Sequence, residues 1–167
     1  MTTTYSAAVK AMQKQFSSYW LLNASMIFGY TPSIEWEGAE QVGKADRANV
    51  WVRFSSQNVF EEQSTLSDFV DRPFSRRFES TGLIFIQIFI PKSIANGLSK
   101  SRDLAEIARN AFRGKSVDGI VFRNARINSL PPEELFYRLN VVVEYQFDEV
   151  SLVDQQDDEN VCLTDLD

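Results

Sequence analysis

Histidine is absent from this chain of 167 residues, and cysteine occurs only once, at Cys162. Without histidine the chain lacks the commonest general acid or base of enzymes and the commonest metal ligand. A single cysteine excludes an internal disulfide and any cysteine–histidine metal set, and it is typical of a reducing compartment. These absences remove every histidine-dependent catalytic triad from the candidate functions.

Glycine, with seven residues, and proline, with five, are also sparse, and neither common phosphate-binding loop occurs. The sequence contains no Gly-x-x-x-x-Gly-Lys-Ser/Thr segment and no Gly-x-Gly-x-x-Gly segment. Residues 20–30 are apolar, but Asn23 and Ser25 interrupt them and they fall short of the ~20 residues that span a bilayer. The N-terminus lacks the basic region of a signal peptide, so we expect a soluble protein that is not secreted.

The net charge of −6 comes entirely from the C-terminal end of the chain. Six of the 23 acidic residues lie from residue 154 onward, where there is no lysine or arginine, and removing them leaves 17 acidic against 17 basic residues. A neutral body argues against a free-standing duplex-binding protein, which needs a basic face. The length favours one domain over residues 1–150, followed by an acidic tail over 151–167 with the composition of disorder.

The segment 82–91, Gly-Leu-Ile-Phe-Ile-Gln-Ile-Phe-Ile-Pro, is the element around which the others are expected to pack. Its side chains alternate between two faces, and both faces are apolar. A short run of this kind is typical of a strand that is covered on both sides. Pro91 lacks an amide hydrogen and ends the strand, while residues 76–81 extend it at the other end. We therefore predict the central strand of a small sheet.

Two segments have the periodicity of amphipathic helices. Apolar residues recur at helical spacing over residues 4–19, and one of the preceding threonines can start that helix. Residues 101–114 form a second apolar stripe, in which Ser101 can cap the first turn and Gly114 can stop the last. The small alanines of this second stripe allow close approach to a sheet.

Three further segments alternate as strands do, namely 49–56, 119–127 and 135–148, and a short edge strand is expected at 34–38. Residues 57–75 show no clear period, which predicts a long loop that is either functional or folded back on its own core. The order of elements predicts an α+β fold: a small mixed or antiparallel sheet of four to five strands with two main helices packed on one face.

Carboxylates are the remaining candidates for chemistry, and Glu134, Glu144, Asp148 and Glu149 lie near one another in the sequence. A nuclease would use such a cluster to bind magnesium. Glu144 and Asp148 are separated by roughly 13 Å along a strand, however, so they cannot share one metal ion unaided. We expect a solvated strand face here, with no metal and no cofactor.

Basic residues gather around the central strand, the end of the second helix and the strand after it: Arg72, Arg76, Arg77, Arg113, Lys115, Arg123 and Arg126. They could line a surface for phosphates or for acidic partners. The alternative is that they pair with Glu79, Glu133 and Glu144 within the sheet, where each pair contributes little. A further hypothesis is that tail carboxylates of one copy contact these arginines on another copy.

Taken in order, Arg77, the strand 82–91, Gly97 and the helix 104–114 resemble the signature of the tail terminator (tail completion) proteins of long-tailed bacteriophages. The further similarities are the first helix, the strand near 34–37, the strand near 119–122 and the long alternating last strand. The resemblance spans roughly residues 5–149, but the chain is longer than many members of the family in the 57–75 region and in the acidic tail, so these two parts inherit nothing from it.

This resemblance implies an α+β subunit that forms a hexameric ring. Such a ring caps the head-proximal end of the tail tube, stops its polymerisation and joins the tail to the head connector. The implied partners are further copies of the chain, the tail tube protein and a head-side connector or stopper protein. Genomic DNA would pass through the lumen without sequence-specific contact, and no membrane is involved. The implied location is the virion tail or neck, and the host cytoplasm during assembly, and the implied role includes no catalysis.

A ring subunit needs two different contact patches, and we expect them on the 57–75 loop and on the exposed side of the strand 135–148. The candidate contact residues are Phe69, Arg72, Arg76, Arg77, Arg123, Arg126, Arg138, Asp157 and Asp158. The alternatives are another neck or head-completion ring protein, a magnesium-dependent nuclease, and an acidic-tailed binding module.

Overall fold

The structure is a computed structural model, and it describes residues 3–39, 48–65 and 75–152. In chain order its elements are α1 (Tyr5–Asn23), α2 (Ser25–Phe28), β1 (Ser33–Trp36), β2 (Trp51–Gln63), β3 (Ser75–Pro91), α3 (Gly97–Asn110), β4 (Ser116–Val117), β5 (Ile120–Ser129) and β6 (Phe136–Leu152).

The described strands form one sheet in the order β1-β2-β3-β6-β5-β4. Strands β1 and β2 are parallel and every other neighbouring pair is antiparallel, so the α+β class with a mixed sheet is confirmed. The predicted number of strands is wrong, because the sheet has six. The additional strand, β4, is a two-residue strand that turns into β5 through Asp118 and Gly119, whose φ angles of 49° and 85° suit a tight hairpin.

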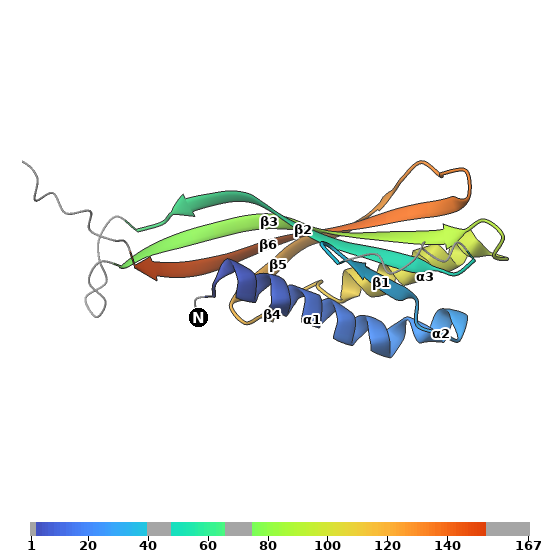
Figure 1. Ribbon diagram of the computed structural model, residues 1–167, viewed down its shortest axis with the longest axis horizontal. Coiled ribbons are helices and arrows are strands. Elements are labelled where there is room, and N and C mark those ends of the chain that lie inside the picture. Colours follow the sequence, from blue (N-terminus) through green and yellow to red (C-terminus); the bar gives the residue numbers. More distant parts are fainter. Residues whose placement is uncertain (1–2, 40–47, 66–74, 153–167) are drawn as a thin grey trace, which may run out of the picture.

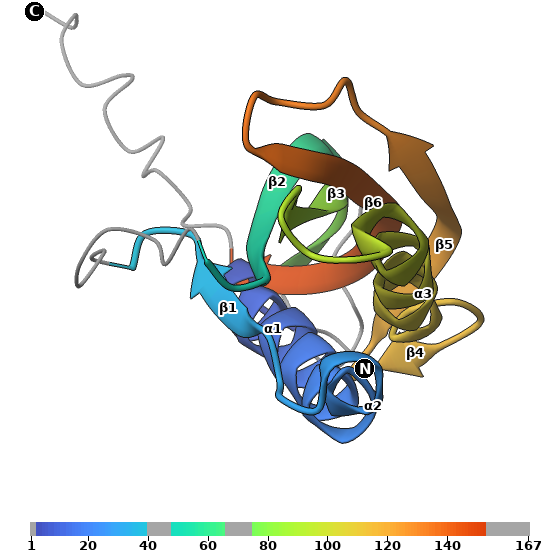
Figure 2. The ribbon, with the colours of Figure 1, turned by 90° about the vertical axis from the view of Figure 1, so that its right-hand side faces the viewer.

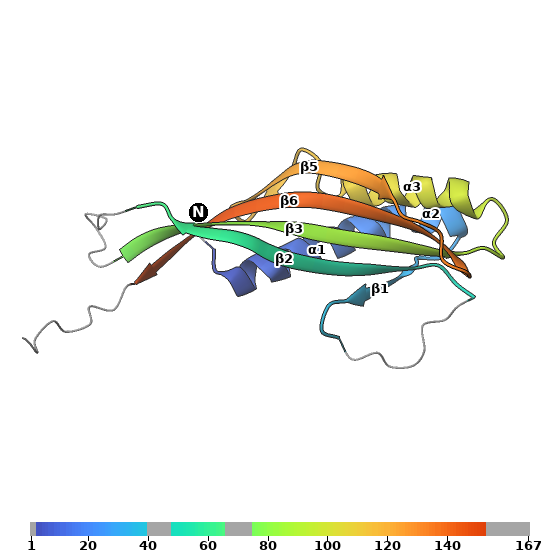
Figure 3. The same cartoon turned by 90° about the horizontal axis from the view of Figure 1, so that it is seen from above.

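Helices α1 and α3 pack on the same face of the sheet, which confirms the predicted layering (Figure 1). Viewed along the long axis, the sheet curls around these helices (Figure 2). The opposite face of β2, β3, β6 and β5 carries no helix in the described part of the chain, as Figure 3 shows from above.

The core lies between the helices and one face of the sheet. On β3 the four isoleucines Ile84, Ile86, Ile88 and Ile90 all point to this side and are fully buried. On α1 the buried residues are spaced by four and end at Trp20, whose indole Nε1 donates a hydrogen bond of 2.9 Å to the backbone oxygen of Pro32. The core-facing stripe that the sequence predicts for α1 is therefore confirmed.

The second face of β3 is less covered than its sequence predicts. Leu83, Phe85 and Gln87 are half-buried, and of the odd-numbered residues from 83 to 89 only Phe89 is buried. The expectation of a strand covered on both sides is therefore wrong for this stretch. No element of the described chain packs over these side chains, so their burial comes from neighbouring strands alone.

The long loop predicted at 57–75 is partly wrong, because β2 continues to Gln63 and pairs with the polar half of β3. Backbone pairing does not require alternating apolar residues, and this stretch lies where few side chains reach the core. A bulge between Asn58 and Phe60 shifts the register there. Residues 66–74 lie outside the described residues.

The start of α1 agrees with the sequence-based expectation, whereas the start of α3 does not. The Oγ1 of Thr4 accepts a hydrogen bond of 3.3 Å from the amide of Ala7, which confirms the threonine cap of α1. Helix α3 begins at Gly97, four residues before the predicted start, because Asn96 adopts a left-handed conformation and turns the chain into the helix. Ser101 is therefore not a cap, and its buried hydroxyl donates to the backbone oxygen of Leu98 at 2.6 Å.

Candidate interaction surfaces

The face of the sheet opposite the helices, here called the open face, is built by residues that lie side by side in the strand register. It consists of Trp51, Arg53, Ser55 and Gln57 on β2, Leu83, Phe85, Gln87 and Phe89 on β3, Arg138, Asn140, Val142 and Glu144 on β6, and Arg123 and Arg126 on β5. Apolar and basic side chains thus share a surface that no described helix covers.

One end of the open face is an aromatic cluster flanked by cations. The rings of Trp51 and Phe89 stack with their centroids 3.9 Å apart and an interplanar angle of 4°. Phe136 meets Phe89 edge-on at 6.3 Å. The guanidinium of Arg53 lies 5.4 Å from the centroid of Trp51, and that of Arg138 lies 5.7 Å from the centroid of Phe89. This end is ordered by stacking and cation–π contacts.

Polar atoms are buried on the open face without a hydrogen-bond partner among the described residues. They include Trp51 Nε1, Arg138 Nε and Asn140 Oδ1. Buried polar groups are normally paired, so an unpaired one points to water or to a partner that completes it. Three such atoms near one end of the same face mark it as a surface that another molecule could complete.

The arginines of this face are mostly neutralised by carboxylates of the same chain. Arg126 lies 2.9 Å from Glu144, which also accepts a hydrogen bond of 2.5 Å from Asn124. The hydrogen bond from Asn124 and the contacts with Arg126 hold the pKa of Glu144 below its usual range. Arg77 pairs with Asp148, and this hydrogen bond raises the pKa of Arg77.

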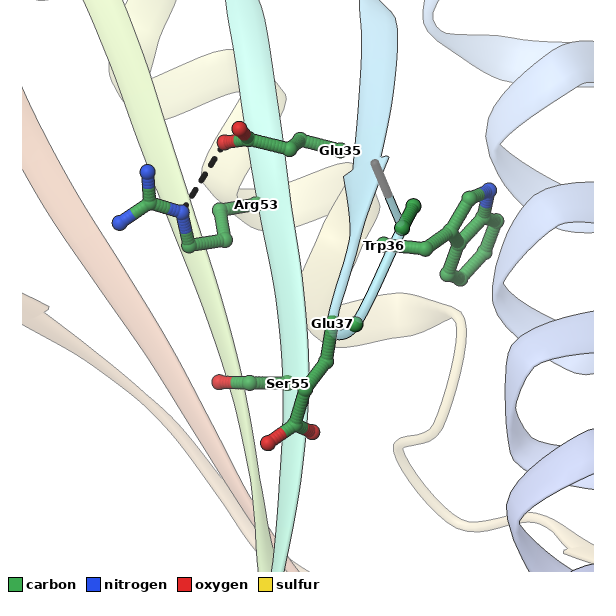
Figure 4. Close-up of a pocket in the computed structure, with 7 residues that line it drawn as sticks. Glu35, Trp36, Glu37, Arg53 and Ser55 are labelled. Atoms are coloured by element: carbon green, nitrogen blue, oxygen red, sulfur yellow. Dashed lines mark hydrogen bonds and ion pairs between the residues drawn. The ribbon is translucent and has the colours of Figure 1, made fainter. Parts of the chain in front are cut away.

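Two more ion pairs lie toward the other end of the sheet. Arg138 pairs with Glu133, and Arg53 lies 3.0 Å from Glu35 of β1 (Figure 4). Of the basic residues for which pairing within the sheet was the alternative, Arg126 pairs with Glu144 as expected, whereas Arg77 pairs with Asp148, which was not an expected partner. Arg123 has no ion pair with any described residue, although it lies opposite Glu144 in the register.

The predicted contact residues separate into three groups. Arg77, Arg123, Arg126 and Arg138 lie on the open face, whereas Arg76 points to its other side. Arg77 and Arg138 are opposite Val150 and Phe89, so roughly 40 Å of strand separates them and they do not form one site. The predicted residues Phe69, Arg72, Asp157 and Asp158 lie outside the described residues.

The two outer strands leave long stretches of sheet edge without a backbone partner in the described chain. Strand β1 pairs only with residues 51–54 of β2, and β4 pairs only with residues 120–121 of β5. Where β1 ends, the carboxylate of Glu37 accepts a hydrogen bond of 3.0 Å from the amide of Ser56, and Figure 4 shows Glu37 beside β2. The short edge strand predicted at 34–38 is confirmed as β1, but the unpaired lengths of β2 and β5 were not predicted, because they depend on pairing partners rather than on side-chain pattern.

The described chain has neither a group of side chains suited to a metal ion nor a helix suited to a bilayer. No three or more of its acidic, cysteine or histidine side chains are grouped so that they could hold a metal ion. Among the described helices, none has the length and apolar character that crossing a bilayer requires.

Comparison with known proteins gives distant likenesses to solved structures. No family model matches the chain, and no curated protein matches it. A solved structure described as "Virion of native gene transfer agent (GTA) particle" is 16% identical, with a TM-score of 0.45. The match covers 87% of this chain and 99% of that one.

Proposed function

We propose that this chain is a structural virion protein of the tail terminator kind, which forms a ring at the head-proximal end of a phage tail tube. The ordered signature of Arg77, the strand 82–91, Gly97 and the helix 104–114 carries the proposal. These residues lie in β3, in α3 and in the turn that follows α3 at residues 111–114, and α3 packs directly on β3 and β6. The proposed role needs no catalytic step and no cofactor.

Gly97 has a physical reason to be part of that signature. A side-chain carbon at this position would lie 3.2 Å from Cγ2 of Ile90 and 3.6 Å from the backbone oxygen of Pro91. Glycine therefore lets the start of α3 approach the end of β3 more closely than another residue would. The turn from strand to helix depends on the two signature residues Pro91 and Gly97 together.

The unpaired edges of the sheet suit a subunit that meets its neighbours through two different patches. The edge of β2 beyond residue 54 and the edge of β5 beyond residue 121 lie on opposite sides of the sheet. A head-to-tail contact between unlike patches closes into a ring when the rotation between copies allows it. Six copies are expected from the resemblance.

Within such a ring, arginines neutralised by carboxylates would hold passing DNA only weakly, because phosphate binding needs free cations.

Electron microscopy of the purified protein, alone and with tail tubes, tests this function. The proposal expects six-fold rings, or tubes with a capped end that no longer elongate when further tube protein is added. Tubes that keep growing at both ends in the presence of excess protein would contradict it. Rings that leave tube growth unchanged would favour another neck or head-completion component instead.

A further inference from the structure

An apolar patch lies exposed at the end of the molecule where α1 ends and α3 begins. Its members, here called the end patch, are Leu21 and Leu22 of α1, Met26 of α2 and Leu98 of α3. The exposed fractions are 60% for Leu21, 77% for Leu22 and 76% for Met26, which are the highest among the large hydrophobic residues described. Isolated apolar residues on a surface are ordinary, but a group at one end marks a contact site.

The local structure brings these residues to the same end. Only Ala24, in a helical conformation, separates α1 from α2, so Leu22 and Met26 lie one helical turn apart. The ammonium of Lys100 lies 5.0 Å from the ring centroid of Phe28 and joins the start of α3 to α2. Figure 2 looks along the molecule onto this end, with α2 toward the viewer.

The helical segments that carry the end patch have an excess of basic residues. Residues 5–28 contain two lysines and no acidic residue, and residues 97–115 contain five basic and two acidic residues, so the excess is 7 − 2 = 5 positive charges. The basic residues are Lys10, Lys14, Lys100, Arg102, Arg109, Arg113 and Lys115. A partner of this surface should therefore combine apolar side chains with carboxylates.

The C-terminal residues of the chain have this composition. Residues 153–167 contain six acidic residues and no basic one, and the aliphatic residues Val153, Val161, Leu163 and Leu166 are interspersed among them. Both the charge and the apolar content of the segment are complementary to the helical segments that carry the end patch. The proposed function uses neither the tail nor the end patch.

The greatest span of the tail, compared with the length of β6, limits which copy's end patch the tail can reach. A side chain at Gly97 would lie 3.6 Å from Tyr137, so the start of α3 sits beside the start of β6. From there β6 runs to Leu152 at the opposite end of the molecule, roughly 50 Å away at strand spacing (Figure 1). Residues 153–167 span at most roughly 50 Å when fully extended. A tail would have to be fully extended for its last residues to reach the patch of its own copy.

We propose that residues 153–167 of one copy dock on the end patch of a second copy. The contact joins two unlike surfaces, so each copy can both offer its tail and receive a tail. The inference concerns only how copies of this chain meet and goes beyond the proposed role at a tail tube.

Cys162, the only cysteine, allows the tail to be probed in the full-length protein. A benzophenone maleimide attached to Cys162 is photoactivated in an equal mixture of ¹⁴N-labelled and ¹⁵N-labelled chains, and the cross-linked peptides are identified by mass spectrometry. We expect mixed-isotope cross-links from Cys162 to peptides that contain Leu22, Met26 or Leu98. Cross-links within one copy only, cross-links to other surfaces, or no cross-links would overturn the proposal.

Variants of the full-length chain test whether the mixed-isotope cross-links depend on the end patch or arise from unspecific contact. Met26→Ser should lower the yield of mixed cross-links about tenfold, because burial of one such side chain is worth about that factor in an equilibrium constant. Val121→Ser, which changes another exposed apolar residue on β5, should leave the yield unchanged. Raising the salt concentration to 1 M should also lower the yield, since it screens surface charges. Equal yields for Met26→Ser and Val121→Ser would overturn the proposal, whatever the tube-capping assay shows.

Discussion

The ring of Tyr145 occupies the space that a side chain on Gly82 would need. The two residues are directly opposite each other in the register of β3 and β6. A side-chain carbon on Gly82 would overlap Cζ of Tyr145 and the backbone oxygen of Gln57 on β2. Glycine in the interior of this strand is therefore required by the packing of its two neighbours.

Gly82→Ala should destabilise the fold by about 3 kcal/mol, because the added methyl group overpacks a position where backbone and ring both block it. Urea unfolding followed by circular dichroism measures the change. Gly38→Ala is the control, since a side chain there meets open space and only the positive φ of 74° opposes it, at about 1 kcal/mol. A loss at Gly82 no larger than at Gly38 would refute this packing.

Tyr145 should make the protein sensitive to alkaline pH. Burial, with smaller contributions from Tyr5 and Glu37, raises the pKa of Tyr145 to about 12. In the unfolded chain a tyrosine has a pKa of about 10. Between about pH 10 and pH 12 the unfolded state therefore loses a proton that the folded state keeps, and stability falls by up to about 3 kcal/mol.

Tyr145→Phe should remove this part of the alkaline loss. Thermal unfolding at pH 8 and pH 11 should show a smaller difference for the variant than for the wild type. At pH 8 the two proteins should agree within about 1 kcal/mol, because the buried hydroxyl of Tyr145 has no hydrogen-bond partner in the described chain. Parallel pH curves for the two proteins would show that the residue titrates normally.

Trp20→Phe should cost about 2 kcal/mol, since it leaves the buried oxygen of Pro32 without the hydrogen bond from the indole. Thermal or urea unfolding gives the value. Trp51→Phe is the matched variant, because Nε1 of Trp51 is buried but donates to no described residue. The expected result is a clearly larger loss for Trp20, and equal losses would mean that its hydrogen bond contributes nothing.

Charge reversal at Arg123 should separate assembly from folding. This side chain is exposed and forms no ion pair with a described residue, so Arg123→Glu should lower the unfolding free energy by at most about 1 kcal/mol, through repulsion from Glu144 opposite it. If the edge of β5 takes part in a ring, the same variant should lower the oligomeric fraction seen by analytical ultracentrifugation. Arg123→Lys keeps the charge and should assemble normally. Unchanged assembly of Arg123→Glu would remove this residue from the contact.

The residues that share a buried face could be predicted, because the spacing of apolar residues along a helix or strand indicates which side chains lie on one side of it. The apolar stripe of α1 faces the core as its spacing predicts, and on β3 the spacing predicts that the four isoleucines share one face, which is the buried one. The extension of β2 to Gln63 could not be predicted this way, because polar residues can pair by backbone alone. The turn between β4 and β5 does have a sequence signal, because Asp118 and Gly119 form a dipeptide that is typical of tight hairpins.

The candidate surfaces were only partly predictable. Sequence could place Arg77 and Arg126 on exposed strand positions, but not their pairing with Asp148 and Glu144, which depends on how β3, β5 and β6 align. The end patch was missed for a different reason. Leu22 and Met26 continue the apolar character of α1, and only the packed structure shows that they lie past the edge of the core.

The pairing of β3 with β6 has a mechanical consequence. It runs from Pro91 and Phe136 to Ser75 and Leu152 without a bulge, whereas the pairings of β2 with β3 and of β5 with β6 each contain one. A pull along the long axis is therefore distributed over the hydrogen bonds of seventeen residues on each strand at once. A pull across the strands would break them one after another, so the subunit should resist tension best along its length.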